Sequence, residues 1–345
     1  MKIRILCTLG PASLRGDVIR GLDERGVDLF RINLSHTPPE AVEPTIAFVR
    51  RHSSIPICLD TQGAQVRCGK VAEGMVLSAG DAVRLTASPV EGTAGELTLW
   101  PGSVFTGMQA GDLVHVDFDG AILQVTELGT GQARAVVLAG GRVKSNRAVN
   151  IDPAPRLAPI TDSDVAAIET GNRLGIRHYA LSFASCASDV ELMRALLPEG
   201  STLISKIESR AGVRNRDDII DASDAVLIDR GDLSREIPVE YVPFYQKAIA
   251  RQANRWNRPV YVATNLLESM VVSRKPTIAE MNDIANTLLD GVHGLVLAAE
   301  TAVGVDPVGA VDTVTRCIRA FEHTTMESLL EEDRSGTGRT VVRSA

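Results

Sequence analysis

The residues of this sequence that are best suited to chemistry are one lysine and two carboxylates near the ends of two apolar runs. Lys206 and Glu208 close the run at residues 203–208, and Asp232 closely follows the run at 226–229. Alternate side chains of a strand point to one face, so we expect Lys206 and Glu208 to point the same way. Carboxylates suit a hard cation such as Mg²⁺, and a nearby lysine suits a phosphate or an enolate. A buried lysine–glutamate pair with a structural role is the alternative.

Apolar, β-branched runs alternate with amphipathic, helix-like segments over most of the chain, which is the pattern of a parallel α/β sheet. Eight runs are expected to form strands: residues 3–10, 27–35, 56–63, 178–184, 203–208, 226–229, 259–265 and 294–300. Eight strands, each followed by helical sequence, predict a (β/α)₈ TIM barrel. A doubly wound sheet is the competing fold, but no glycine-rich dinucleotide loop follows the first strand.

The sequence between the third and fourth of these strands has a different character. Residues 68–155 lack helical periodicity and consist of short runs of Val, Leu, Thr and Gly broken by turn residues. They predict a small all-β barrel domain inserted after strand three. We therefore expect residues 1–67 and 156–325 to form the catalytic barrel, and the polar residues 326–345 to form a disordered tail.

Polar side chains recur at the carboxyl ends of the predicted barrel strands. They are Arg31, Asn33, Ser35, Asp60, Thr61, Lys206, Glu208, Asp232, Thr264 and Glu300. In a TIM barrel the carboxyl ends of all strands meet at one mouth, where such enzymes hold their catalytic residues. A purely structural core, with every polar group hydrogen-bonded, would not place polar residues at the ends of so many strands. The pattern therefore favours an enzyme.

Composition argues against several other classes of protein. The formal net charge of −7 disfavours a nucleic acid as the main partner. No apolar run is long enough to span a bilayer, and the first residues form a strand pattern rather than the apolar segment of a signal peptide. The five cysteines are scattered without a CxxC motif, which indicates reduced thiols in a cytoplasmic protein.

Several short segments that carry these polar residues resemble the pyruvate kinase family. In the family's order they are CTLGPAS at 7–13, RINLSH at 31–36, LDT at 59–61, ISKIE at 204–208, RGDL at 230–233, EIP at 236–238, AT at 263–264, LESM at 267–270, PT at 276–277 and ETA at 300–302. The resemblance implies a barrel with a β lid that closes on the substrates, and a further C-terminal domain that we do not expect in this chain. The implied reaction is the glycolytic transfer of a phosphoryl group between phosphoenolpyruvate and ADP, giving pyruvate and ATP.

The resemblance implies a role for each polar residue at the barrel mouth. Glu208 and Asp232 would hold Mg²⁺ or Mn²⁺, and Lys206 would stabilise the phosphoryl group in flight and the developing enolate. Arg31 and Thr264 complete the implied catalytic set. The residues implied for the substrate are Ser182, Gly231, Asp232 and Thr264.

The resemblance also implies a monovalent cation pocket and a side that faces the nucleotide. A pocket for K⁺ would be formed by Asn33, Ser35, Asp60 and Thr61. ADP or ATP would be faced by Arg31, Asn33, His36, Arg67, Asp119 and Arg147, and this last arginine stands where the family usually has a lysine. The implied partners are phosphoenolpyruvate, pyruvate or a related 2-oxo acid together with the nucleotide, and a homo-oligomer would form through the barrel.

The sequence departs from the family pattern at several positions. Gln62 and Gln65 are neutral where the family has a lysine and a glutamate, which argues against K⁺ dependence. Asp229 replaces an alanine and would add an anion close to the substrate carboxylate. Val303 replaces a lysine that lies near the nucleotide phosphates in the family.

Three functions are compatible with an intact metal centre whose neighbours have changed. The first is a compact pyruvate kinase. The second is a paralogue that keeps the metal–enolate site but acts on another 2-oxo acid or acceptor, as a lyase, an aldolase or a phosphotransferase that does not use ADP. The third is a non-catalytic binding module, which we favour least because drift without catalysis should have eroded Lys206, Glu208 or Asp232.

Overall fold

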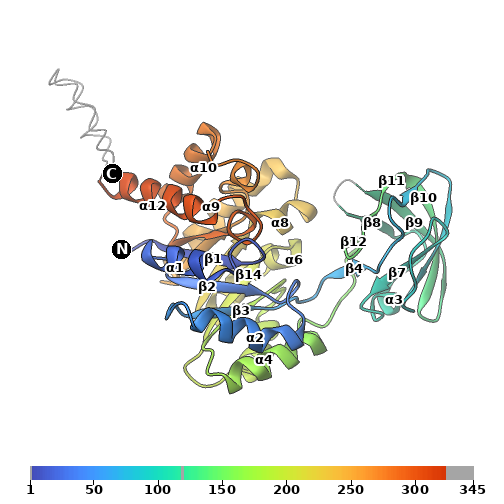
Figure 1. Cartoon of the computed structure of the whole chain (residues 1–345). Coiled ribbons are helices and arrows are strands. Elements are labelled where there is room, and N and C mark those ends of the chain that lie inside the picture. The colour runs from blue at the N-terminus through green and yellow to red at the C-terminus, as the bar shows by residue number, and fades with distance from the viewer. Residues whose placement is uncertain (1, 118–119, 324–345) are drawn as a thin grey trace.

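The protein consists of a helix-covered barrel and a smaller β domain joined to it by two extended segments (Figure 1). The computed structural model describes residues 2–117 and 120–323 of the chain. The expectations for Asp119 and for the tail at 326–345 lie outside the described residues. Among the described helices, none combines the length and the hydropathy that a membrane span requires.

The larger body is a closed barrel of eight parallel strands. The strands are β1 (Arg4–Leu9), β2 (Leu29–Asn33), β3 (Ile57–Asp60), β13 (His178–Leu181), β14 (Thr202–Ile207), β15 (Ala225–Asp229), β16 (Val260–Ala263) and β17 (Gly294–Leu297). Their order around the barrel is β1-β17-β16-β15-β14-β13-β3-β2, and neighbouring strands pair in parallel. The predicted (β/α)₈ barrel is therefore confirmed.

Helices follow the strands and cover the outside of this barrel (Figure 1). They are α1 (Gly16–Glu24), α2 (Pro39–Arg50), α4 (Asp162–Arg173), α5 (Ala187–Ala195), α6 (Arg210–Arg214), α7 (Arg216–Ala222), α8 (Arg230–Glu236), α9 (Val242–Arg255), α10 (Ile278–Leu289), α11 (Ala299–Ala302) and α12 (Pro307–His323), with 3-10 turns η1 (Val239–Tyr241) and η2 (Glu268–Val271). Thr161 and Thr277 begin α4 and α10 with reciprocal capping boxes. These caps satisfy N–H groups that the first helical turn leaves without partners.

Two apolar layers hold the barrel together. The outer layer packs the strands against the helices and contains fully buried side chains such as Phe30 and Tyr179. The inner layer fills the barrel with Leu6, Leu29, Cys58, Ala180, Ile204, Ala225, Leu227, Tyr261, Ala263 and Val296. Inner and outer side chains alternate along each strand, so the position two residues after an inner apolar residue points to the mouth.

The smaller body is a second closed barrel with its own core. Its seven strands are β4 (Val66–Cys68), β6 (Ala82–Thr86), β7 (Glu96–Trp100), β8 (Leu113–Val116), β9 (Ala121–Gly129), β10 (Gln132–Ala139) and β12 (Ala148–Asp152), accompanied by the pair β5 (Val76–Leu77) and β11 (Gly141–Arg142) and the short helix α3 (Val104–Gly107). Leu85, Leu97 and Leu123 are fully buried inside it.

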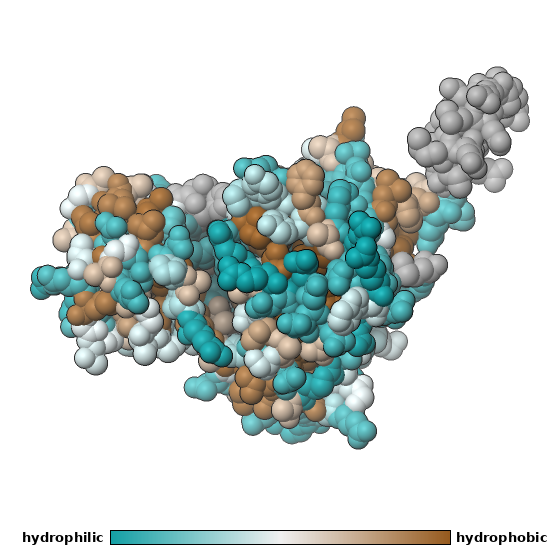
Figure 2. All heavy atoms as spheres, turned by 180° about the vertical axis from the view of Figure 1, so that it is seen from behind, coloured by the Kyte–Doolittle hydropathy of each residue, from teal (hydrophilic) through white to brown (hydrophobic). Residues whose placement is uncertain are grey.

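This second barrel confirms the predicted β domain inserted after strand three, and we call it the lid. The domain boundaries expected at residues 67 and 156 stay predictions. Seen from the opposite side, hydrophilic and hydrophobic side chains are interspersed on the surfaces of both bodies (Figure 2).

Candidate active site

Charged side chains gather at the mouth where the barrel strands end. Lys206 lies on β14 and Glu208 directly follows that strand. Asp229 ends β15, and Asp232 lies in α8, which follows at once. Asp60 ends β3. We call these five residues the buried cluster, in which Asp232 is the partly exposed member with a side chain 23% exposed. The cluster lies at the end of the barrel where TIM-barrel enzymes hold their catalytic residues.

Lys206 is at the centre of the buried cluster. Its side chain is 4% exposed, and its ammonium group lies 3.1 Å from Glu208 Oε2, 3.6 Å from Asp60 Oδ2 and 3.9 Å from Asp229 Oδ2. It also donates a hydrogen bond of 3.1 Å to the Ser182 hydroxyl. Burial acts to lower the pKa of Lys206, but the surrounding carboxylates outweigh burial and the net pKa is raised. Lys206 is therefore a fixed positive charge in a site closed to water.

Glu208 is fully buried, and its two oxygens have different partners. Its Oε1 accepts a hydrogen bond of 2.8 Å from the backbone N–H of Phe183. Among the described residues no donor forms a hydrogen bond with Oε2, although that atom makes the ion pair with Lys206. Burial raises the pKa of Glu208 to about 8 against the opposing charge of Lys206. A bound cation would favour the ionised carboxylate and share Oε2 with Lys206.

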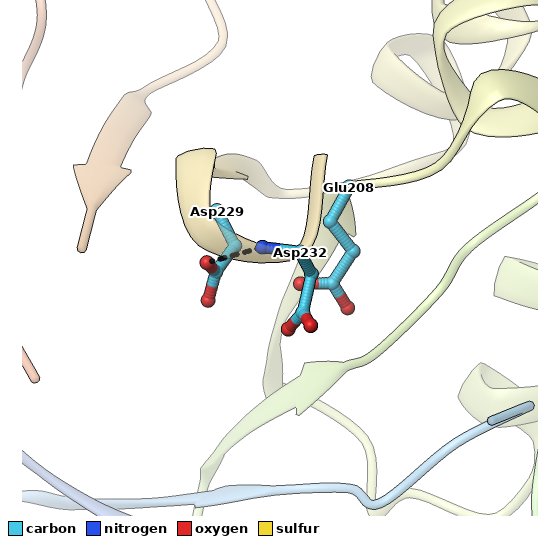
Figure 3. Close-up of side chains that lie close together, drawn as sticks. All are labelled: Glu208, Asp229 and Asp232. Carbon is cyan, nitrogen blue, oxygen red and sulfur yellow. Dashed lines mark hydrogen bonds between the residues drawn. The ribbon is translucent and has the colours of Figure 1, made fainter. Parts of the chain in front are cut away.

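Glu208, Asp229 and Asp232 form a group suited to a metal ion. One oxygen of each lies within 4.8 Å of the others, and their carboxylates turn to the same side (Figure 3). Asp232 also pairs with Arg235 at 3.2 Å, and burial together with the charge of Asp229 raises the pKa of Asp232. A ligand set made of oxygen atoms suits Mg²⁺ or Mn²⁺ better than it suits softer metals.

Buried carboxylates outnumber buried cations around Lys206. With Glu208 ionised, Asp60, Glu208 and Asp229 would carry three negative charges, against two positive charges on Lys206 and Arg31. An excess of buried charge is costly in a medium of low dielectric constant unless a counter-ion joins it. A divalent cation on the carboxylates would remove this excess, so the residues present fit the ion.

Arg31 is held by Asp60 rather than turned to open space. Its guanidinium forms an ion pair with the fully buried Asp60 carboxylate and donates to Thr8 Oγ1 at 2.9 Å. Burial acts to lower the pKa of Arg31, but the charges of Asp60 and Asp229 reverse the direction. A phosphate at this position would therefore have to share Arg31 with Asp60.

The residues expected to hold a monovalent cation lie around Asp60. Asn33 and Asp60 are register partners on β2 and β3, and Asn33 Oδ1 accepts a hydrogen bond of 2.9 Å from the Ser35 N–H. The N–H of Ser182 donates to Thr61 Oγ1 at 2.9 Å, and the Ser182 hydroxyl lies 3.2 Å from Asp60 Oδ1. The Asp60 carboxylate is already paired with Arg31 and Lys206. K⁺ binding at this place stays a prediction.

The residues expected to face the nucleotide form a more exposed, basic group. Burial, and then the positive charges of Arg67, Arg31 and Arg147, lower the pKa of half-buried His36. Arg147 comes from the lid, where its Nε lies 3.5 Å from Asp117 Oδ2. We call His36, Arg67 and Arg147 the basic group. Its charge suits a phosphate chain.

The chain is similar to known pyruvate kinases in sequence and in structure. The family model described as pyruvate kinase, barrel domain, matches residues 1–311. The chain belongs to the pyruvate kinase family. It is 35% identical over 330 residues to a pyruvate kinase of Mycobacterium tuberculosis, over 92% of this chain and 70% of that protein. It is 36% identical over 340 residues to a pyruvate kinase of Geobacillus stearothermophilus, over 93% of this chain and 58% of that protein.

The three-dimensional comparison agrees with the sequence comparison. A crystal structure of a pyruvate kinase from Cryptosporidium parvum matches with a TM-score of 0.83 and 30% identity, over 99% of this chain and 73% of that one. This member of the pyruvate kinase family is accordingly an enzyme, a phosphotransferase built on a TIM barrel with an inserted lid.

Glu300 does not join the other charges that the sequence placed at the mouth of this pyruvate kinase family member. It is fully buried and accepts hydrogen bonds from the N–H groups of Leu267 and Ala298, at 3.0 and 2.8 Å. It therefore fastens two loops at the mouth. Val303, which follows α11, is 55% exposed, so a longer side chain can be accommodated there.

Asp229 is the residue whose part in the site the sequence reasoning missed. The sequence indicated only an additional anion near the substrate carboxylate, whereas the structure makes Asp229 a member of the three-carboxylate group. A signal was present in the alternation of β15. Leu227 belongs to the inner layer of the barrel, so the side chain two residues later must also turn inward, at the mouth.

Proposed function

We propose that this chain transfers a phosphoryl group between phosphoenolpyruvate and ADP in a metal-dependent reaction that gives pyruvate and ATP. The observation that carries the proposal is the buried Lys206 held between Glu208 and Asp60, beside carboxylates that fit a divalent cation. Phosphoryl transfer depends on positioned charge more than on covalent chemistry by the protein. Membership of the pyruvate kinase family supports the same reaction.

Lys206 would act on the atoms that change bonds. The bond between the enol oxygen and phosphorus breaks, and a bond forms between phosphorus and a terminal oxygen of ADP. The remaining enolate takes up a proton at its methylene carbon and becomes pyruvate. The Lys206 ammonium, whose raised pKa keeps it charged, would stabilise negative charge on the phosphoryl oxygens and on the enolate oxygen.

Glu208 and Asp232 would hold Mg²⁺ or Mn²⁺. When bound, the ion neutralises phosphate charge and polarises the substrate oxygens. Two observations support this assignment: Glu208 Oε2 accepts no hydrogen bond from the described residues beside its ion pair with Lys206, and buried carboxylates outnumber the buried cations near it. Arg31, shared with Asp60, would bind the transferring phosphate from another side.

Three donors that the family resemblance assigns to the substrate carboxylate lie near the metal group. They are the N–H groups of Gly231 and Asp232 and the hydroxyl of Thr264, and we call them the carboxylate cradle. Gly231 N lies 2.7 Å from Thr264 Oγ1. Thr264 has a φ of +68°, which β-branched residues rarely adopt and which proteins retain where function requires it.

The remaining assignments concern the nucleotide and the monovalent ion. His36, Arg67 and Arg147, with Arg31, would face the phosphates of ADP, and the lid would carry Arg147 toward them. Residues for K⁺ would be Asn33, Ser35, Asp60 and Thr61. The neutral Gln62 and Gln65 reduce the negative charge near that pocket, so we expect a weak preference of K⁺ over Na⁺.

Pyruvate release from phosphoenolpyruvate tests the proposed function. The purified chain is assayed with Mg²⁺, with and without ADP, and with K⁺ or Na⁺. We expect release that requires ADP and falls by roughly 10³-fold in Lys206→Met, because the ammonium contacts the reacting atoms. Lys247→Met is the matched control, since Lys247 is exposed and pairs with Asp290.

Two results would contradict this proposal. One is a Lys206→Met rate close to that of the unmodified chain, which would remove Lys206 from the reaction. The other is no release by a protein that still binds Mg²⁺, which would favour the alternative enzyme acting on another 2-oxo acid.

A further inference from the structure

The carboxylate of Asp229 lies inside the carboxylate cradle. Its Oδ1 accepts hydrogen bonds from the N–H of Gly231 at 3.2 Å, from the N–H of Asp232 at 3.4 Å and from the Thr264 hydroxyl at 3.0 Å. Asp229 is buried, with 4% of its surface exposed. The two backbone hydrogen bonds make Asp229 the N-cap of α8, and it shares two of its three donors: the Gly231 N–H also donates to Thr264 Oγ1 at 2.7 Å, and the Thr264 hydroxyl also reaches the Ala263 carbonyl at 2.6 Å. One oxygen of the chain thus contacts every donor proposed for the substrate.

A substrate carboxylate and Asp229 cannot both use this cradle. The three donors converge on a single oxygen, and a second carboxylate would stand against the first in a buried site. Two carboxylates that share the same hydrogen-bond donors repel each other strongly where the dielectric constant is low. The side chain at position 229 therefore decides whether the cradle can receive an anion from outside.

The second oxygen of Asp229 faces the cationic side of the site. Asp229 Oδ2 lies 3.9 Å from the Lys206 ammonium. An oxygen of Asp229 also stands within 4.8 Å of oxygens of Glu208 and Asp232. Apart from its ion pair with Lys206, the fully buried Glu208 Oε2 accepts no hydrogen bond from the described residues, which supports a further cation there.

We propose that Asp229 is a specificity-determining residue that stands in for the carboxylate of the substrate. One of its oxygens closes the cradle, and the other completes a three-carboxylate site for the divalent cation. This inference rests on the proposed function, which makes the cradle the subsite of the substrate carboxylate. Two consequences follow: the cation binds firmly without substrate, and the free carboxylate of a 2-oxo acid contributes little to binding.

Two binding measurements test these consequences separately. Mn²⁺ binding to the protein alone is measured by calorimetry and by the electron spin resonance of free Mn²⁺. At saturating Mn²⁺, the dissociation constants of pyruvate and of uncharged pyruvamide are then compared. In the unmodified chain we expect the two compounds to bind with similar affinity, since the cradle is already filled.

Asp229→Ala should change both measurements in opposite directions. Mn²⁺ alone should bind roughly tenfold more weakly or worse, because one carboxylate ligand is gone. Pyruvate should bind roughly tenfold more tightly and be preferred over pyruvamide, because the cradle is open and the repulsion is lost. Asp217→Ala, which removes an exposed aspartate of α7, is the control for net charge.

Asp229→Asn separates charge from occupancy and guards against a misfolded alanine variant. Its amide oxygen can still accept from the cradle donors, while the amide nitrogen cannot ligate a cation. We expect weak Mn²⁺ binding without the gain in preference for pyruvate over pyruvamide. Circular dichroism of all variants establishes that the barrel is intact.

Specific outcomes would overturn the inference. Unchanged Mn²⁺ affinity in both Asp229→Ala and Asp229→Asn would exclude Asp229 as a ligand. An unchanged ratio of pyruvate to pyruvamide affinity in Asp229→Ala would exclude it as the occupant of the cradle. If both shifts occur but no variant releases pyruvate from phosphoenolpyruvate and ADP, the proposed function fails and the role of Asp229 stands.

Discussion

The buried cluster and the basic group lie at the same barrel mouth but hold their charges in different ways. Lys206 lies on β14, Glu208 directly follows that strand, and both are buried. The Arg147 side chain is 49% exposed and comes from the lid. Charges in the interior interact strongly and keep one geometry, whereas exposed charges are screened by water and salt. Changes in the buried cluster should therefore have far larger effects than changes in the basic group.

The largest effect on the metal is expected for Glu208→Gln. This change keeps the shape of the side chain but removes a charged ligand, so Mn²⁺ binding should weaken by roughly 100-fold and turnover should fall with it. The fold should persist without metal, because one negative charge leaves a crowded set of carboxylates. Calorimetric Mn²⁺ titration and thermal unfolding measure the two effects.

Glu169→Gln is the control for this change, since Glu169 is exposed on α4. Equal Mn²⁺ affinity in Glu208→Gln and the control would exclude Glu208 as a ligand. It would also contradict the larger effect expected for changes in the buried cluster than for changes in the basic group.

A large effect on stability is expected for Arg31→Gln. The change leaves the fully buried Asp60 carboxylate without its closest cation, and breaking one side of a buried ion pair costs about 3–5 kcal/mol in unfolding free energy. Urea denaturation measures this loss. Turnover should fall as well, because Arg31 is the proposed phosphate contact.

The double variant Arg31→Gln/Asp60→Asn separates the two consequences. Removing the stranded charge should recover much of the stability while turnover stays low. Recovery of turnover together with stability would show that Arg31 serves the fold and does not contact the phosphate.

A moderate effect is expected for Arg147→Gln in the basic group. An exposed charge contributes at most about 1 kcal/mol, so KM for ADP should rise by roughly fivefold and the difference should shrink at high salt. Steady-state kinetics at two ionic strengths measure it. Arg134→Gln, on the same lid and 76% exposed, should leave KM unchanged. An equal response of both variants would point to the net charge of the lid alone.

The smallest effect is expected for Val303→Lys. The side chain is 55% exposed, so the added ammonium should lower the dissociation constant of ADP only by about two- to threefold. Val305→Lys is the matched control, because Val305 is 53% exposed in the same segment. Isothermal titration with ADP and Mg²⁺ distinguishes them. An identical constant for Val303→Lys and the unmodified chain would show that position 303 does not face the phosphates.

The sequence predicted the parts of the site that depend on strand periodicity. Lys206 and Glu208 are two residues apart at the end of β14, and a period of two is a property of any strand. Their convergence with Asp60 followed once eight strands were recognised, because all carboxyl ends of a TIM barrel meet. The lid was recognisable from the change in pattern alone.

The contacts that depend on side-chain direction beyond the strand ends were not predictable in the same way. The sequence placed Glu300 at a strand end like Asp60, but β17 ends at Leu297 and Glu300 lies in α11, where its carboxylate accepts hydrogen bonds from backbone N–H groups. The sequence suggested a phosphate contact for Arg31 but gave no sign of its ion pair with Asp60, with which a phosphate would have to share it. Sequence spacing does not rank such competing partners, since each has a donor or an acceptor within reach.

By itself, the sequence determined the barrel, the inserted lid and the lysine–carboxylate pair, because these follow from periodicity and from the topology of parallel strands. Only the tertiary structure decided that Asp229 fills the carboxylate cradle. That contact joins β15 to the residue after β16, Thr264, whose backbone has a positive φ. The position of the Thr264 hydroxyl depends on how two strands and their loops pack together, so the local sequence pattern does not predict it.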